Sequence, residues 1–318
     1  MPDENTVEEE GLADTTYDVG IIGAGPAGMT AALYTGRANL KTVVFGNIFD
    51  SQLAKAGDVE NYPGFDSIKG IELVERFNNQ LGKYNVIQIP TYITRIMRRD
   101  DMFTLVTDNA KYRCRSVIIA TGSKFKSLNI PGEKEFTYKG VSYCAVCDGS
   151  FYKNRKVALI GTGDHAAKGA IYLAGLCKDV VLLTAKADLE TMYIDQVNAQ
   201  PNITVVYNAK VTAIEGKDVV SQIKYIVKEE PETTIKVDGV FIEGGIPNSV
   251  LASELGLELD KKSYIIVNRP DHTTNIDGVF AAGDITGGIH QISKAVGEGA
   301  CAAVSAAVYL KKAKARAK

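Results

Sequence analysis

The sequence contains little of what marks several common classes of protein. Its 318 residues include only five cysteines, an odd and sparse set unlike that of a secreted, disulfide-stapled domain. Lys and Arg (36) nearly balance Asp and Glu (38), so no charge excess predicts binding to nucleic acid or to an anionic membrane. No apolar run is long enough to span a bilayer. We therefore expect a cytoplasmic protein that is not anchored in a membrane.

The first residues also lack an apolar stretch. Residues 1–16 carry six acidic side chains and no hydrophobic run of the kind found in a signal peptide. We expect residues 1–16 to form a disordered acidic extension. The whole chain is 45% hydrophobic and 23% charged, which is a globular composition, and it is long enough for two domains of ordinary size.

Two segments of the chain have the same order of strand, glycine turn, helix and strand. The first comprises residues 17–22, the turn at 23–28, a helical pattern, and residues 41–45. The second comprises residues 156–160, the turn at 161–166, residues 167–176, and residues 180–183. Each is the opening unit of a doubly wound parallel sheet. The sequence therefore predicts an α/β fold with two Rossmann-like domains, each built in three layers.

The first glycine turn has the composition of a dinucleotide-binding site. Gly23 permits the tight turn, Gly25 lets a pyrophosphate reach the helix N-terminus, and Gly28 allows the helix to pack closely on the strand. The acidic residue expected after the second strand is missing, because Gly46 and Asn47 follow it. The adenosine ribose must then be held in another way.

Two cysteines, Cys144 and Cys147, lie between the two glycine turns. Such a pair can be half of a zinc site, two inert core thiols, or a redox-active disulfide. A structural zinc site needs four ligands, but the other cysteines are single and the three histidines show no paired spacing. Two cysteines separated by two residues can close a small disulfide ring, and one thiolate can leave from the other. The redox interpretation is therefore favoured.

Several motifs occur in the order seen in one family. They are Gly23 to Gly28, Ser51-Gln52-Leu53, Val59 to Phe65, Ala120-Thr121-Gly122, Cys144 to Gly149, and Ala282-Gly283-Asp284. Over residues 17–310 the chain resembles the low-molecular-weight thioredoxin reductases, which are FAD-dependent disulfide reductases. The cysteine segment is the most specific part of the match, because larger disulfide reductases carry their redox pair in the FAD domain.

The resemblance implies a domain arrangement and a set of site residues. Residues 17–122 and 249–318 would form the FAD-binding domain, and residues 123–248 an inserted, smaller NADPH-type domain that carries the cysteines. The residues implied to bind FAD are Gly23, Ala24, Gly25, Pro26, Ala27, Gly28, Gln52, Asn61, Thr121, Gly122, Gly283, Asp284, Gln291 and Ile292. Gln52 and Asn61 would face the isoalloxazine, although Ser51 stands where the family usually has glycine.

The resemblance also implies the redox roles. Cys147 would receive electrons from the flavin, Cys144 would attack the disulfide of a thioredoxin or thioredoxin-like partner, and Asp148 would move the proton. It further implies a homodimer.

The second glycine turn departs from the family pattern. NADPH-dependent members follow the next strand with a His-Arg-Arg cluster that holds the 2′-phosphate, whereas this chain has Thr184, Ala185 and Lys186 there. A phosphate dianion is best held by arginine forks. We therefore expect a donor other than NADPH, either reduced ferredoxin or a reduced deazaflavin. The alternatives are a conventional NADPH-dependent thioredoxin reductase, a flavin-dependent redox sensor, and a protein like a ferredoxin–NADP reductase.

Overall fold

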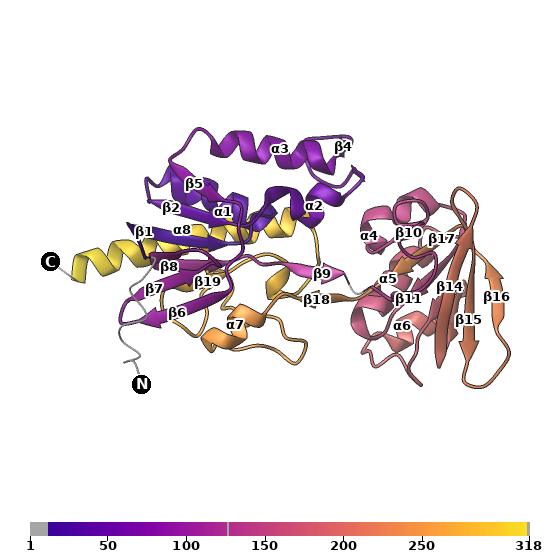
Figure 1. Cartoon of the computed structure of the whole chain (residues 1–318). Helices are drawn as coiled ribbons and strands as arrows, with labels where there is room; N and C mark the ends of the chain where they lie inside the picture. Colours follow the sequence, from indigo (N-terminus) through magenta and orange to yellow (C-terminus); the bar gives the residue numbers. More distant parts are fainter. Residues whose placement is uncertain (1–11, 126, 317–318) are drawn as a thin grey trace. The chain divides into compact units, whose positions relative to one another are not determined.

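The computed structural model describes residues 12–125 and 127–316, which divide into two compact units. Unit 1 contains the described residues up to Lys124 and from Pro247 onward, and unit 2 contains Phe125–Ile246. The domain boundaries predicted from the sequence, after residue 122 and before residue 249, each lie two residues from a boundary between the two units. Each unit contains a parallel sheet packed on helices, which confirms the predicted α/β fold (Figure 1).

Unit 1 is formed by the two ends of the described chain. Its N-terminal part contains β1 (Leu12–Ile22), α1 (Pro26–Arg37), β2 (Thr42–Phe45), η1 (Ile48–Asp50), α2 (Gln52–Lys55), β3 (Asp58–Val59), β4 (Ile68–Lys69), α3 (Gly70–Leu81), β5 (Val86–Ile89), β6 (Arg95–Arg99), β7 (Met102–Val106), β8 (Lys111–Ile119) and β9 (Ser123–Phe125). Its C-terminal part contains α7 (Val250–Leu255), β19 (Val279–Ala281), η3 (Asp284–Thr286) and α8 (Ile292–Arg316), and β18 (Gly245–Pro247) crosses the boundary from unit 2, as β9 crosses it in the other direction.

The main sheet of unit 1 has the order β5-β2-β1-β8-β7-β6, and β19 pairs with the second half of β8. β5, β2, β1, β8 and β19 are parallel, whereas β6, β7 and β8 form an antiparallel meander. The carboxyl ends of the parallel strands meet at one edge of the sheet, where ligands bind in doubly wound folds. The glycine turn after β1 and Asp284 after β19 lie at this edge.

The predicted N-terminal extension is wrong for residues 12–16. These residues form the first half of β1, which pairs with β8 at Leu12 opposite Lys111 and at Thr16 opposite Arg113. Backbone pairing to an existing strand holds this segment, although its side chains show no hydrophobic run. The rest of the predicted extension, residues 1–11, lies outside the described residues.

Both faces of the unit 1 sheet are covered. On one face, α1 and α8 pack through small buried residues such as Ala27, Ala31 and Ala302. On the other face, α7 and the segment after it contribute Ala252, Leu257 and other apolar side chains. This double burial explains why the parallel strands have continuous apolar sequences.

Unit 2 is formed by one continuous segment. It contains β10 (Val141–Ser142), α4 (Ala145–Asp148), η2 (Gly149–Tyr152), β11 (Lys156–Ile160), α5 (Gly163–Ala174), β12 (Asp179–Leu183), α6 (Ile194–Asn198), β13 (Ile203–Val206), β14 (Ala209–Gly216), β15 (Val220–Val227), β16 (Thr233–Lys236) and β17 (Gly239–Ile242). The parallel sheet has the order β10-β17-β11-β12-β13. Helices cover one face, and the antiparallel sheet β14-β15-β16 covers the other.

The two segments that connect the units pair with each other as the short sheet β18-β9. Beside it, the Asn248 amide donates to the Gly122 carbonyl (3.0 Å), and the Thr121 hydroxyl donates to the Asn248 carbonyl (2.8 Å). The predicted site residues Thr121 and Gly122 therefore tie the outgoing and returning chain together.

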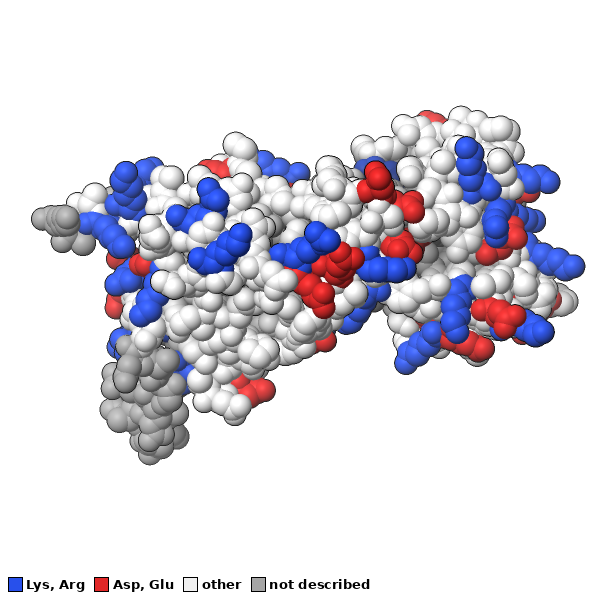
Figure 2. Space-filling view, turned by 90° about the horizontal axis from the view of Figure 1, so that it is seen from above, with Lys and Arg blue, Asp and Glu red and all other residues white. Residues whose placement is uncertain are grey.

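The surface carries charge of both signs. Figure 2 shows Lys and Arg together with Asp and Glu on the face in view, over both units. No helix among the described residues combines the length and the apolarity needed to cross a membrane.

Candidate active site

The first glycine turn is closely packed at two of its glycines and open at the third. Gly23 has φ +112°, and a Cβ at Gly28 would lie 1.8 Å from the Gly23 carbonyl oxygen, so α1 approaches the end of β1 more closely than a side chain allows. In contrast, a Cβ at Gly25 would meet only the Cβ of Ser51, at 4.0 Å. The turn therefore leaves space in front of Gly25.

The backbone amides of this turn differ in the same way. The Gly23 amide donates to the Phe45 carbonyl (2.8 Å), whereas no oxygen among the described residues accepts the Gly25 amide. α1 begins directly after it, with Pro26 at its first position. An unpaired amide at a helix N-terminus, facing open space, suits a phosphate oxygen.

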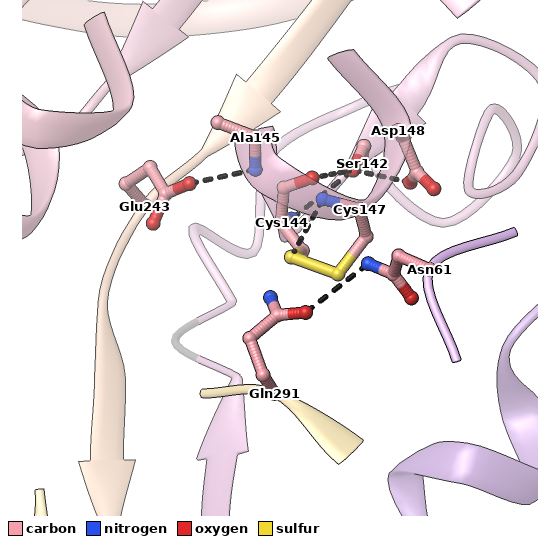
Figure 3. Close-up of a disulfide and its surroundings, with 8 residues drawn as sticks. All are labelled: Asn61, Ser142, Cys144, Ala145, Cys147, Asp148, Glu243 and Gln291. Atoms are coloured by element: carbon pink, nitrogen blue, oxygen red, sulfur yellow. Dashed lines mark hydrogen bonds between the residues drawn. A yellow bond between two sulfur atoms is a disulfide. The ribbon is translucent and has the colours of Figure 1, made fainter. Parts of the chain in front are cut away.

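Hydrogen bonds connect the predicted flavin-side residues of unit 1. Asn61 Nδ2 donates to Gln291 Oε1 (3.1 Å), as Figure 3 shows. Gln52 Nε2 donates to the carbonyl oxygen and hydroxyl of Ser123, and that hydroxyl donates to Asp284 Oδ2 (3.3 Å). Residues far apart in the sequence are thus brought together at the carboxyl edge of the sheet. Ile292, the remaining member, is the first residue of α8 and packs on the small apolar cluster around Leu53.

A buried ion pair lies behind Asp284. Lys294 Nζ contacts Glu298 Oε2 at 3.0 Å and donates to the Gly283 carbonyl oxygen at 2.9 Å, and the exposed fractions of the two side chains are 12% and 10%. Glu298 also accepts the Gly283 amide (2.9 Å) and the Thr286 hydroxyl (2.8 Å). Burial raises the pKa of Asp284, an effect that His290 and Lys294 oppose. These contacts fix the turn after β19.

Cys144 and Cys147 form a disulfide in unit 2, at the N-terminus of the short helix α4 (Figure 3). Cys144 is the N-cap residue, and its sulfur accepts the Cys147 amide at 3.2 Å. Cys144 is partly buried, whereas Cys147 and Val146 are exposed. The redox interpretation of the pair is the one that this geometry supports, because both sulfurs are already bonded to each other.

Asp148 lies at the end of the same helix. Its Oδ2 accepts a short hydrogen bond from the Ser142 hydroxyl (2.6 Å), and Ser142 Oγ in turn accepts the Cys144 amide (3.1 Å). Burial is the main cause that raises the pKa of Asp148, and the Ser142 bond partly opposes it. Asp148 therefore retains a proton to a higher pH than an exposed aspartate, as a group that exchanges protons with thiols requires.

A second carboxyl group, Glu243, approaches the other end of α4. It follows β17, and its Oε1 accepts the Ala145 amide at 2.8 Å (Figure 3). Burial raises the pKa of Glu243 to about 7. The Gly161 and Gly169 positions come close to it, because a Cβ at either would lie within 3.4 Å of a Glu243 atom. Two carboxyl groups with raised pKa values thus contact the segment that carries the disulfide.

In the second glycine turn, in unit 2, both glycine amides already donate to carbonyl oxygens of the protein. The Gly161 amide donates to Leu183 O (3.1 Å), as Gly23 does to Phe45 in unit 1. The Gly163 amide, however, donates to the Leu189 carbonyl at 2.7 Å, and the Thr162 hydroxyl donates to the same oxygen at 3.3 Å. Leu189 is 1% exposed, so this loop is anchored in the core. The amide that corresponds to Gly25 is therefore already bonded.

The residues after β12 offer little to a nucleotide phosphate. Thr184 is buried, and Lys186 Nζ pairs with Glu190 at 3.5 Å. In the first turn of α5, Asp164 Oδ1 accepts the Thr191 hydroxyl at 2.8 Å, which adds a carboxylate beside the turn. The bonded Gly163 amide and the Asp164 carboxylate thus disfavour an anion at this turn.

Sequence reasoning missed several residues that contact the predicted site, among them Ser142 beside Asp148. Ser123, Lys294 and Glu298 belong to the unit 1 network, and Glu243 belongs to unit 2. The spacing of Lys294 and Glu298 by four residues on one helix is a signal that could have been used. Glu243, a single carboxyl between an apolar strand and two glycines, is another.

The comparisons with known proteins agree with this geometry. The family model described as pyridine nucleotide-disulphide oxidoreductase matches residues 17–299. A thioredoxin reductase from Bacillus subtilis is 38% identical over 249 residues, which are 76% of this chain and 78% of the relative. The crystal structure of thioredoxin reductase from Streptococcus pyogenes is 36% identical with a TM-score of 0.86, over 94% of this chain and 100% of that chain.

A ferredoxin-flavin thioredoxin reductase from Clostridium acetobutylicum is 36% identical with a TM-score of 0.54, over 95% of this chain and 99% of that chain. Since the family model covers most of the sequence, the chain belongs to the pyridine nucleotide-disulphide oxidoreductases. Within them it is a flavoprotein oxidoreductase of the thioredoxin reductase type, with FAD as cofactor. The open space and unpaired amide at Gly25 fit the FAD pyrophosphate.

Proposed function

We propose that this protein reduces the disulfide of a thioredoxin or thioredoxin-like partner, and that its electrons come from a donor other than NADPH. The observation that carries the second part is the Leu189 carbonyl, which accepts the Gly163 amide that would otherwise bind a nucleotide pyrophosphate. The first part is supported by the disulfide on α4, by the thioredoxin reductases among its relatives, and by the carboxyl groups around it.

In this proposal the residues of unit 1 hold FAD, and bound FAD supplies an electron pair to the disulfide. Gly25 and the N-terminus of α1 would hold the pyrophosphate, Asp284 would bind the ribitol or phosphate end, and Gln52 and Asn61 would face the flavin. Gln291 and the N-terminus of α8 contribute to the same end of the site. The remaining FAD contacts are those named from the sequence.

The cysteines then exchange disulfides with the partner. Two electrons break the Cys144–Cys147 bond and leave two thiol groups, with Asp148 moving a proton between them and solvent. The Cys144 thiolate attacks one sulfur of the partner disulfide and forms a mixed disulfide, while the partner's other sulfur leaves as a thiolate. The Cys147 thiolate attacks Cys144, restores the internal disulfide and releases the reduced partner.

The donor proposal is supported from two sides. A phosphate-bearing cofactor would have to displace Leu189 from the Gly163 amide, and Lys186 is the only cation in the segment from Thr184 to Glu190. The similarity to the Clostridium acetobutylicum protein favours reduced ferredoxin, and a reduced deazaflavin is the other candidate. The resemblance further supports a homodimer in the cytoplasm.

The donor is tested by anaerobic mixing of the FAD-loaded protein with NADPH, with NADH and with chemically reduced ferredoxin. We expect the visible flavin absorbance to bleach rapidly with ferredoxin and to remain with both nicotinamides. A conventional NADPH-dependent thioredoxin reductase, treated in parallel, shows that the nicotinamide solutions are active. Rapid bleaching by NADPH would overturn the donor proposal and leave thioredoxin reduction in place. A Cys144→Ser variant that still reduced thioredoxin would overturn the disulfide mechanism.

A further inference from the structure

Glu243 is a carboxyl group that the proposed exchange does not use. It lies at the end of β17, directly before Gly244 and Gly245, and its Oε1 accepts the amide of Ala145, the residue that follows Cys144. Its surroundings are mostly apolar, since Ala145, Leu159 and Ala166 belong to the core on this side of the sheet. A partly buried carboxyl group bonded to the backbone of a redox turn needs a physical account.

We propose that Glu243 is a positioning residue that takes up a proton when the Cys144–Cys147 disulfide is reduced, and that it thereby sets the acidity of the Cys144 thiol. This inference rests on the disulfide exchange proposed above. The inference concerns the amide of Ala145 and the sulfur of Cys144. It can be tested without the electron donor and without the thioredoxin partner.

The hydrogen bonds at the N-terminus of α4 show how this coupling works. The Cys147 amide points at Cys144 Sγ (3.2 Å), and the Ala145 amide points at Glu243 (2.8 Å). In the oxidised protein Cys144 Sγ carries no charge, and the Ala145 amide is bonded to the carboxyl group of Glu243. On reduction the Cys144 thiolate becomes a second negative charge at the same helix end. Two nearby anions in a partly buried site raise each other's proton affinity, so one of them takes up a proton.

Burial raises the pKa of Glu243 to about 7, so small changes in its surroundings alter its proton occupancy near neutral pH. The titratable groups on the elements packed around it are Asp148 and the cysteines on α4, and Asp164, His165 and Lys168 on α5. On the neighbouring strands, Lys156 lies at the opposite end of β11, and Lys224 of β15 is bonded to Glu215. Burial is the leading cause of the shift, and the Ala145 bond opposes it.

The electrons and protons of the disulfide reduction still balance when Glu243 has this role. Two electrons from the bound flavin, or from a dithiol such as dithiothreitol in the test, break the sulfur–sulfur bond. The two sulfurs together carry two negative charges before protonation. Asp148 and solvent supply the proton for one sulfur, and Glu243 holds a further proton while the Cys144 sulfur stays anionic. When the Cys144 thiolate attacks a partner disulfide its charge disappears, and Glu243 releases that proton.

The test uses the full-length, FAD-loaded protein reduced with dithiothreitol, without donor or thioredoxin. The alkylation rate of Cys144 is followed against pH, with peptide mass spectrometry to separate it from Cys147. Glu243→Gln keeps an oxygen that can accept the Ala145 amide but removes the charge. Since a neighbouring charge changes a pKa by about one unit or more, we expect about a tenfold larger acid dissociation constant for Cys144 in this variant.

The matched control is Glu215→Gln, which removes an exposed carboxylate of the same unit that is paired with Lys224. We expect it to match the wild type. Glu243→Asp keeps the charge, and we expect it to restore most of the wild-type pH profile. As a second measurement, an indicator dye reports the net proton release on reduction at neutral pH. Oxidation of dithiothreitol frees two protons, which the protein takes up except where Cys144 stays anionic, so Glu243→Gln should release more protons than the wild type.

Coincident pH profiles of the wild type and Glu243→Gln would overturn the inference, and so would an equal shift in Glu215→Gln. If Glu243→Gln did not fold, Glu243→Asp together with wild-type proton uptake decides the question. A wild-type proton balance that the measured ionisation of the two thiols accounts for in full would then refute the role. Because neither readout involves thioredoxin or the electron donor, these results are distinct from a failure of the proposed function.

Discussion

A single methyl group at Gly25 should separate FAD binding from folding. Its φ of −82° and ψ of −173° suit alanine, and an added Cβ would meet only the Ser51 Cβ at 4.0 Å. The change therefore costs the protein alone little. The same methyl group points into the space that the FAD pyrophosphate would enter in the proposed site at the N-terminus of α1. We expect Gly25→Ala to fold normally and to bind FAD poorly.

The size of the effect follows from crowding one methyl group into a close contact. Overpacking of this kind costs about 1–3 kcal/mol, which is an increase in the FAD dissociation constant of roughly 5- to 150-fold. The assay titrates FAD into apoprotein and follows the quenching of flavin fluorescence. The thermal unfolding midpoint of the apoprotein, measured in parallel, should stay within about 2 °C of the wild type, since surface substitutions without a clash change stability by about 0.5 kcal/mol or less.

Gly28→Ala is the matched control, because it adds the same methyl group where the protein itself has no room. The new Cβ would lie 1.8 Å from the Gly23 carbonyl oxygen, so α1 must move away from β1. We expect this variant to lower the unfolding midpoint of the apoprotein as well as its FAD affinity. Unchanged FAD affinity in Gly25→Ala would refute the placement of the pyrophosphate at this turn.

Three further predictions concern other carboxyl groups and their partners. Asp148→Asn removes the carboxyl group that exchanges protons, and it should slow thioredoxin reduction by prereduced protein roughly 10²-fold in stopped-flow mixing. If the rate fell no more than it does in Ser142→Ala, the Asp148 carboxyl group would move no proton. For Glu243, the folded-state pKa of about 7 lies above the ordinary 4.5, so the unfolded state loses its proton first as the pH rises. The free energy of unfolding should therefore fall by up to about 3 kcal/mol between these two pH values. Urea titrations should show this fall in the wild type and not in Glu243→Gln. Lys294→Met should destabilise unit 1 by about 3 kcal/mol, because it removes the nearer and more buried of the two cations beside the Glu298 carboxylate and leaves only Arg269, at 3.9 Å, among the described residues. Lys294→Met with Glu298→Gln should recover part of that loss in the same titrations.

The sequence was most informative where one physical rule determines the residue type. The glycine turn of unit 1, its flanking strands and the cysteine pair could all be placed from the sequence, because a strand, a tight turn and a helix require these residues at this spacing. The beginning of β1 could not be placed, since residues 12–16 are held by backbone pairing with β8 and their side chains carry no strand pattern.

The missed residues share a different property, which is that their roles depend on contacts over long sequence distances. Ser123 donates to Asp284, and Glu243 accepts from Ala145, at sequence separations of 161 and 98 residues. Nothing in the residues around Ser123 or Glu243 indicates which backbone or side chain they meet. The topology of the sheet decides this, because the carboxyl ends of strands distant in sequence meet at one edge.

The two glycine turns of this chain show how one local fold can serve two purposes. Both turns bond their first glycine amide to the end of the next strand, through Phe45 in unit 1 and Leu183 in unit 2. They differ at the third residue, where Gly25 has an unpaired amide and Gly163, with φ of +71°, donates to the Leu189 carbonyl. Because the Gly163 amide already has an acceptor within the protein, a phosphate would add no hydrogen bond at this turn. Unit 2 therefore does not need a cation there to balance a phosphate.

What unit 2 does require is a rigid support for the disulfide. The ends of β10 and β17 hold α4 from both sides, with Ser142 bonded to Asp148 and Glu243 bonded to the Ala145 amide. In unit 1, the carboxyl edge of the sheet carries the predicted FAD-binding residues. In unit 2, the corresponding edge positions the carboxyl groups of Asp148 and Glu243 around the two cysteines. If a nucleotide were the donor, this edge would have to hold it as well, and the loop at Leu189 would have to leave the core, where its side chain is 1% exposed. The cost of exposing a buried leucine, about 1.5–3 kcal/mol, would reduce nucleotide affinity by roughly 10- to 150-fold before any loss of phosphate contacts.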